Sequence, residues 1–115
     1  MAKFMFVFRG GGVVQKELSP AQLGAHLEKW KVWVGELAKK GHHEDGGQLL
    51  HNSGKVVRGA AKTVIDGPFA ESKDMVTGTM LIVAESLEAA TTLALGCPVY
   101  EFDGSVEVRA IVAHG

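Results

Sequence analysis

The run Lys3–Arg9 most narrows the folds open to this chain, because it is apolar at nearly every position. Successive side chains of a strand point to opposite faces, so the three phenylalanines of this run share one face while Met5 and Val7 share the other. Apolar residues on both sides are typical of a central strand that is covered on both faces. We therefore predict such a strand here, with other elements packed on both of its faces.

A helix is predicted after the glycines that follow this strand. Ser19–Gln22 has the form of a capping box with proline at the first helical position. Apolar residues then recur at steps of four and three, which places them on one side of a helix that ends near Gly41. These residues are Leu23, Leu27, Trp30, Val34 and Leu37.

The remaining segments complete a small α+β pattern. Short β-prone pieces between Gly41 and Phe69 are separated by turn signals and predict a hairpin. Thr79–Glu85 is a further apolar strand, Ser86 caps a short helix, and the alternation over 106–112 predicts a last strand with a more polar outer face. The order is βαββαβ, which predicts an antiparallel sheet with two helices on one face.

The size of the chain limits it to one domain, residues 1–115, with one modest core. Two helices cover only one face of a four-stranded sheet, so the other apolar face needs a partner. A second copy is the simplest cover, and we expect a homodimer with a two-fold axis. Met5, Val7, Leu81 and Val83, or their neighbours on the opposite face, are expected at the interface or at a cavity beside it.

Charge and cysteine content exclude several classes of function. Twelve Lys and Arg against thirteen Asp and Glu give a net charge of −1, so no overall field favours nucleic acid or an anionic membrane. No apolar stretch approaches the ~20 residues that span a bilayer. Cys97 is the only cysteine, and the first nine residues lack the features of a secretory signal, so we expect a cytoplasmic location.

The segment Asp66–Lys73 is the most distinctive in the chain. Aspartate can bond to the backbone beyond it, glycine allows positive φ, and proline fixes its own φ and restricts the glycine before it. From the residues alone, the segment is a turn followed by a solvated, charged surface that includes Glu71 and Lys73.

Together with several later motifs, this segment resembles the DGPF group of the YCII-related family. The resemblance rests on Asp66–Lys73, Gly78, Ser86–Ala90 and Val106–Arg109, with Trp30, Leu37 and Gly41 in the first half. It implies a ferredoxin-like fold that pairs into a dimeric α+β barrel, with a cleft between sheet and helices. The DGPF group has no agreed activity, although YCII-related proteins have been considered enzymes that use a His and an Asp. The resemblance therefore implies a His/Asp pair as the candidate chemistry. Three positions depart from the family pattern: Ser72, Asp74 and Ala110.

Three residues are candidates for acid–base chemistry: His26, Asp66 and Glu71. His26 lies at the border of the apolar helix face, where a neighbouring carboxylate would tune it for proton abstraction. Asp66 or Glu71 is expected to orient it or to act as its acid partner. The alternative is a border histidine that bonds to backbone or water.

Three cations are candidates for holding a small anionic ligand: Arg9, Lys73 and Arg109. A guanidinium binds a carboxylate with two parallel hydrogen bonds, which suits such a ligand. The alternative for both arginines is an ion pair on adjacent strands, for which Glu107 is available.

We expect no metal and no cofactor. His42–Asp45 offers ligand atoms, but adjacent histidines rarely converge on one ion and the spacing of a structural zinc site is missing. Nothing from the family is carried over to these four residues, because they do not fit its pattern. Cys97 follows a helix end, where the helix dipole disfavours a thiolate, so cysteine catalysis is not expected.

Two functions remain. The first is a noncatalytic dimeric module that binds a small ligand or another protein, with the turn at Asp66–Lys73 as a rigid recognition edge. The second is a small cofactor-independent lyase or isomerase that uses a His/Asp pair on a small anionic substrate. We favour the first, because no complete catalytic set can be traced and a fold does not fix a function.

Overall fold

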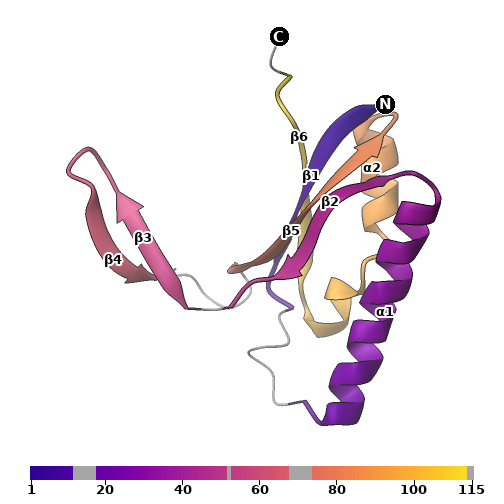
Figure 1. Cartoon of the computed structure of the whole chain (residues 1–115), viewed down its shortest axis with the longest axis horizontal. Coiled ribbons are helices and arrows are strands. Elements are labelled where there is room, and N and C mark those ends of the chain that lie inside the picture. The colour runs from indigo at the N-terminus through magenta and orange to yellow at the C-terminus, as the bar shows by residue number, and fades with distance from the viewer. Residues whose placement is uncertain (12–17, 52, 68–73, 114–115) are drawn as a thin grey trace.

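The computed structural model describes residues 1–11, 18–51, 53–67 and 74–113. Within these residues, six strands, two α-helices and a short 3₁₀ helix, η2, follow one another along the chain (Figure 1). Their bounds are β1 Ala2–Arg9, α1 Pro20–Lys39, β2 His43–Leu49, β3 Gly54–Arg58, β4 Thr63–Gly67, β5 Val76–Ala84, α2 Leu87–Ala94, η2 Pro98–Phe102 and β6 Ser105–Ala110.

The main sheet has the strand order β2-β5-β1-β6, and all its pairs are antiparallel. Without β3 and β4, the elements follow the βαββαβ order, with the first strand in the middle of the sheet. The predicted α+β, ferredoxin-like class is therefore confirmed. Strands β3 and β4 pair only with each other and form an additional hairpin between β2 and β5.

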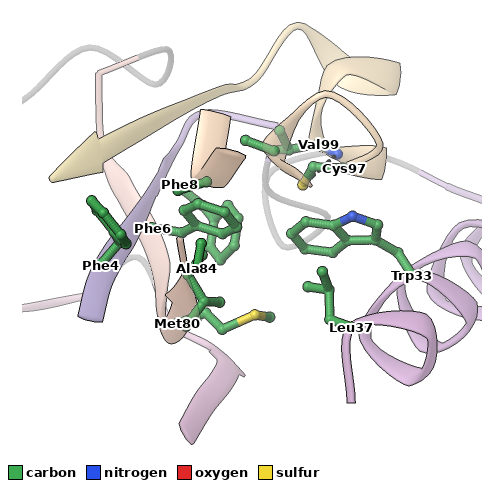
Figure 2. Packing of buried hydrophobic residues seen from close by; sticks show 12 residues of the cluster. Phe4, Phe6, Phe8, Trp33, Leu37, Met80, Ala84, Cys97 and Val99 are labelled. Carbon is green, nitrogen blue, oxygen red and sulfur yellow. Dashed lines mark hydrogen bonds between the residues drawn. The ribbon is translucent and has the colours of Figure 1, made fainter. Parts of the chain in front are cut away.

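The core lies between the main sheet and the two helices (Figure 2). The three phenylalanines of β1 share one face, as predicted; the structure shows that this face points into the core, and Phe6 is fully buried. Trp33 of α1 stacks on Phe6, with ring centroids 6.1 Å apart and planes 14° apart. The other buried apolar residues are Leu37, Met80, Ile82, Ala84, Ala90, Ala94, Cys97 and Val99.

Both helices begin at the predicted caps. The Ser19 hydroxyl accepts a hydrogen bond from the Gln22 amide while the Gln22 side chain accepts one from the Ser19 amide, which completes the capping box. Ser86 caps α2 through the Ala89 amide. Neither helix of the described chain combines the length and apolar character needed to cross a bilayer.

The buried face of α1 is turned relative to the predicted one. His26, Trp33 and Leu37 are its buried residues, whereas Leu27 is 39% exposed. Trp33 takes the central place because its ring stacks on Phe6, and the helix is then oriented with His26, two turns earlier, inside. Trp30 and Val34 remain at the edge of the core, partly buried.

The opposite face of the sheet is uncovered in the single chain. Met5 pairs with Leu81, and Lys3 pairs with Val83, so these side chains form a continuous strip with Val7. The four apolar members of this strip are half-buried. We call this surface the open face; both helices lie on the other side of the sheet (Figure 1).

The hairpin Gly54–Gly67, which we call the arm, stands away from the rest of the protein, which we call the body (Figure 1). A hairpin between Gly41 and Phe69 was predicted, and its register runs from the pair Gly54 and Gly67 to the pair Arg58 and Thr63.

Candidate functional site

His26 is buried more deeply than its sequence position suggests. It is 1% exposed, and its ring lies 4.6 Å from the ring of Phe102, centroid to centroid. Helix α1 brings it there because the residue lies two turns before Trp33, on the helix side that faces η2 and the sheet. A border histidine was predicted, but the structure places it inside.

The contacts of His26 determine which ring nitrogen carries the proton when the side chain is neutral. The indole Nε1–H of Trp30, one turn later on the helix, donates to Nε2 of His26 at 2.9 Å. Nε2 therefore carries a lone pair, and the neutral ring has its proton on Nδ1. Nδ1 is buried without a hydrogen-bond partner among the described residues, and the nearest carboxylate oxygen, Oε2 of Glu101, is 3.4 Å away.

Glu101 connects His26 to the surface. Its Oε2 accepts a hydrogen bond from Nζ of Lys29 at 2.8 Å. This hydrogen bond, followed by the contact with His26, holds the pKa of the Glu101 carboxyl below its usual value, against the opposing effect of desolvation. The carboxylate is thus ionised at neutral pH and can stabilise positive charge at Nδ1. At 3.4 Å this contact is longer than a normal charged hydrogen bond.

A cleft lies between α1 and the end of β2. Its deep end, beside His26, is a cavity of about 20 Å³, close to the space of one water molecule. Its outer part holds about 320 Å³ and is lined by Leu27, Trp30, Lys31, Val34, Gly47 and Leu49. Leu27, Trp30, Gly47 and Leu49 line both parts, so the two form one cleft.

Two glycines shape the wall of this cleft. Gly47 has φ of +107°, at an irregularity in the pairing of β2 with β5 that turns the strand. Gly78 of β5 pairs with Leu49, two residues after Gly47, and a Cβ there would lie 2.9 Å from the carbonyl oxygen of Gln48. A side chain at Gly78 would therefore push β2 away. The two glycines keep β2 close to β5 where the cleft begins.

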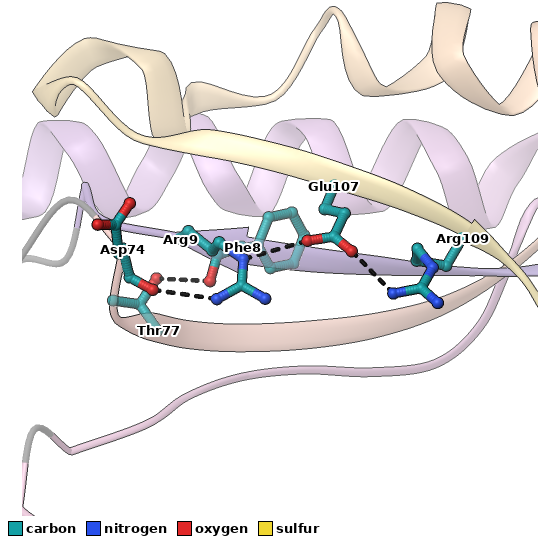
Figure 3. A network of polar contacts seen from close by, with 6 residues as sticks. All are labelled: Phe8, Arg9, Asp74, Thr77, Glu107 and Arg109. Atoms are coloured by element: carbon teal, nitrogen blue, oxygen red, sulfur yellow. Dashed lines mark hydrogen bonds and ion pairs between the residues drawn. The ribbon is translucent and has the colours of Figure 1, made fainter. Parts of the chain in front are cut away.

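The predicted arginines lie on the open face, not in the cleft (Figure 3). Nε of Arg9 contacts Oε1 of Glu107 at 3.2 Å, and Nη1 of Arg109 contacts Oε2 at 3.0 Å. Both contacts hold the pKa of the Glu107 carboxyl below its usual value, and the hydrogen bond from Arg109 has the larger effect. Arg9 also donates to the carbonyl of Asp74 at 3.0 Å. The ion-pair alternative for both arginines is thus the arrangement observed.

Asp66 lies on the arm and is not brought to His26 within the chain. Its side chain is 80% exposed and pairs with Lys55 across the hairpin. Glu71 and Lys73, and with them most of the Asp66–Lys73 segment, lie outside the described residues. Among the described residues, Glu101 is the carboxylate that lies beside His26.

The remaining candidates for chemistry are occupied by structural contacts. Burial raises the pKa of the Cys97 thiol to about 12, so the group is not a thiolate at neutral pH. His42 contacts the carbonyl of Val83 at 2.9 Å through Nδ1, and His43 contacts that of Gly46 at 3.2 Å through Nε2. The two adjacent histidines therefore serve different backbone groups.

Sequence reasoning missed Glu101 and the end of β2 as parts of the site. Glu101 lies 75 positions after His26 in a short 3₁₀ turn, where no periodic pattern marks a side chain as facing inward. Gly47 was part of a stretch with turn signals rather than a strand. The Trp30–His26 contact had a detectable signal, because residues four apart on a helix are neighbours.

Comparison with known proteins adds the following. A family model described as YCII-related domain matches residues 35–114, more than half of the chain. Among solved structures, 5-chloro-2-hydroxyhydroquinone dehydrochlorinase from Burkholderia phenoliruptrix AC1100, in complex with 2,5-dihydroxybenzoquinone, is similar over 98% of this chain and 95% of its own, with 17% identity and a TM-score of 0.49. No curated protein matches.

Proposed function

This chain belongs to the YCII-related domain family, and from that premise we propose that it is a homodimeric module that binds a small, flat, mostly apolar anion. The observation that carries the proposal is the cleft between α1 and β2, which is lined mostly by apolar side chains and ends at a buried histidine. Small-molecule sites are typically concave and apolar with a few polar groups that set orientation. We place the protein in the cytoplasm, in keeping with its single, unpaired cysteine.

The lining of the cleft supports a flat ligand. The Trp30 indole borders both parts of the cleft, and its N–H is already held by His26, so the ring is fixed in position. A fixed aromatic ring offers a face on which a planar ligand can stack. Leu27 and Leu49 add apolar surface at the mouth, where they are 39% and 49% exposed.

The charge at the mouth supports an anion. Lys31 is the one charged side chain among the described residues that line the outer part of the cleft. A second groove, of about 480 Å³, lies on another side of α1 and is lined by Glu28 and Glu36 as well as Lys29. Its carboxylates disfavour an anion, so we assign the ligand to the cleft with Lys31.

The open face supports the dimer. Its apolar strip is bordered by the ion pair of Lys3 with Glu44, at 3.3 Å, and by the arginines on either side of Glu107. An apolar centre with a mixed-charge rim is the usual composition of a protein interface. A second copy presents the same surface and therefore fits a two-fold contact.

Two adjacent leucines give a matched test of the cleft. Leu49 and Leu50 are both 49% exposed, but only Leu49 lines the cleft. With 2-naphthalenesulfonate as a flat anionic probe, we expect saturable binding at one site per chain. Leu49→Gln should weaken it about tenfold through lost apolar contact, whereas Leu50→Gln should leave it unchanged. Equal effects of the two variants would exclude the cleft as the site.

The charge of the ligand is tested separately. Lys31→Gln should weaken binding of the same probe and reduce the dependence of its affinity on salt, because an exposed cation acts through screened attraction. Lys39→Gln, on the same helix but outside the cleft, is the control. An unchanged affinity in Lys31→Gln would show that apolar contacts alone hold the probe, and would contradict the proposed preference for an anion.

Proton transfer by His26 is the second candidate, in a lyase or isomerase. It is favoured by the unpartnered Nδ1 of His26 beside the Glu101 carboxylate. Because the neutral ring already carries its proton on Nδ1, a base role requires Nε2 to accept the substrate proton after the Trp30 indole has turned away, with Glu101 stabilising the resulting cation at Nδ1. We expect the NMR chemical shifts of the His26 ring to change in Glu101→Gln and to stay the same in Asp66→Asn. A response to Asp66→Asn instead would place the arm of another copy beside His26.

A further inference from the structure

The arm has no core of its own. Val57 and Val64 face each other on one side of the hairpin and are 64% and 61% exposed. Val56 and Ile65 form the next pair and point to the other side. A two-stranded hairpin is at best marginally stable in water. Val56 and Ile65 are half-buried, so the exposed Val57/Val64 pair is the one that calls for a covering surface.

The arm does not find this surface in its own chain. Its strands pair with each other and pack against no other element of the described body to a comparable extent. The radius of gyration is 15.5 Å, whereas a compact chain of this length has about 13 Å. The excess reflects the arm, which extends away from the body (Figure 1).

The arm extends to the same side of the main sheet as the open face. The helices lie on one side of the main sheet, and the arm leaves on the other side, toward which the open face looks (Figure 1). The open face and the arm thus border the same space. A second copy whose open face meets this one would lie beside the arm.

Charge indicates which part of a second copy the arm contacts. The arm carries three cations and one carboxylate, a net charge of +2, whereas the rest of the chain carries nine cations and twelve carboxylates, a net charge of −3. Arg58 and Lys62 form no ion pair within the described residues, while Lys55 is paired with Asp66. Two arms would repel each other, and an arm and a body attract.

We propose that the arm is a clasp: in the dimer, the hairpin Gly54–Gly67 of each copy packs its Val57/Val64 side against the body of the other copy. This inference rests on the dimer of the proposed function and adds a surface that the open face alone does not supply. It makes the arm part of the interface and not a free appendage.

The first test is the dissociation constant of the dimer, measured by sedimentation. Val57→Thr with Val64→Thr keeps two β-branched residues and hence the hairpin, but reduces apolar burial. We expect about tenfold weaker dimerisation. Val32→Thr is the control, because Val32 is 56% exposed on α1, away from the open face, and should leave the constant unchanged. An unchanged constant in the double variant would overturn the clasp.

The second test reads the contact directly. In a dimer mixed from ¹³C-labelled and unlabelled copies, isotope-filtered NMR should show contacts from the Val57 and Val64 methyl groups to body residues of the other copy. A dimer without these contacts overturns the clasp and leaves the dimer and the cleft intact. A monomer at all concentrations overturns both clasp and dimer, while the binding test on Leu49 still decides the ligand site.

Discussion

Strand β1 of the body and strand β3 of the arm are both antiparallel and both rich in residues that favour strands, yet they differ in what covers them. In β1, the phenylalanine side meets α1 and α2, and Phe6 is completely buried. In β3, Val57 has no such cover and stays 64% exposed. Strand pairing therefore does not explain why β1 is buried and β3 is exposed. The body is stabilised by a second layer, and the arm lacks one.

The largest expected effect is in the core of the body. Phe6→Ala should lower the free energy of unfolding by about 3–5 kcal/mol, because a fully buried ring leaves a cavity between β1 and Trp33. Urea unfolding followed by circular dichroism measures it. A loss below about 1 kcal/mol would mean that the core collapses around the gap, and the contrast with the arm would be weaker than the burial indicates.

A smaller effect is expected at the hydrogen bond between Trp30 and His26 inside the body. Trp30→Phe removes the donor to Nε2 of His26 and leaves a buried acceptor unpaired, which costs about 1–3 kcal/mol. The same change made in a His26→Leu background should cost less, since no acceptor remains, and this double-mutant cycle isolates the hydrogen bond. Equal costs in the two backgrounds would show that the indole acts only by packing.

The open face should respond to acid through Glu107. Its pKa is lower in the folded chain than the usual 4.5, because Arg109 and Arg9 bind the carboxylate. A lowered folded pKa contributes stability above pH 4.5 that is lost as pH falls through the folded value. Glu107→Gln should therefore be less stable than the wild type near pH 6, and the two should converge in acid. Curves that stay parallel down to pH 2 would contradict this ion pair.

The smallest effect is expected in the arm of an isolated copy. Val64→Thr should change the free energy of unfolding by less than about 0.5 kcal/mol when the chain is diluted to the monomer, because the side chain is 61% exposed. Thermal unfolding at a series of concentrations measures it. A loss near that of Phe6→Ala in the monomer would show that the arm is covered by its own body after all.

The same contrast explains which parts of the fold could be predicted from the sequence. Strand β1, the capped start of α1 and helix α2 carry their own periodicity and caps, so local patterns were enough. Strand β2 was harder. It begins with His43 and Glu44 and contains two adjacent glycines, which resemble a turn, and only its pairing with β5 makes it a strand.

The candidate site was predictable only in part, for a related reason. His26 was identified from its helix position, but its burial depends on how α1 is oriented by the contact of Trp33 with Phe6. Its carboxylate neighbour depends on how the chain returns through η2, 75 residues later. Asp66 was chosen from a turn motif, which predicts backbone shape and not the distance to another element. Arg9 and Arg109 had a nearer partner in Glu107, as the alternative interpretation held.

The point where the arm joins the body has a consequence for the protein as a scaffold. Strands β2 and β5 are already neighbours, with Leu49 opposite Gly78 and the Leu50 amide bonded to the Thr77 carbonyl at 2.9 Å. A segment inserted here starts and ends at two strands that the sheet itself holds together, so lengthening it adds little closure entropy. The junction is therefore a suitable insertion site, where a foreign hairpin or a peptide epitope could replace the arm while the body folds unchanged.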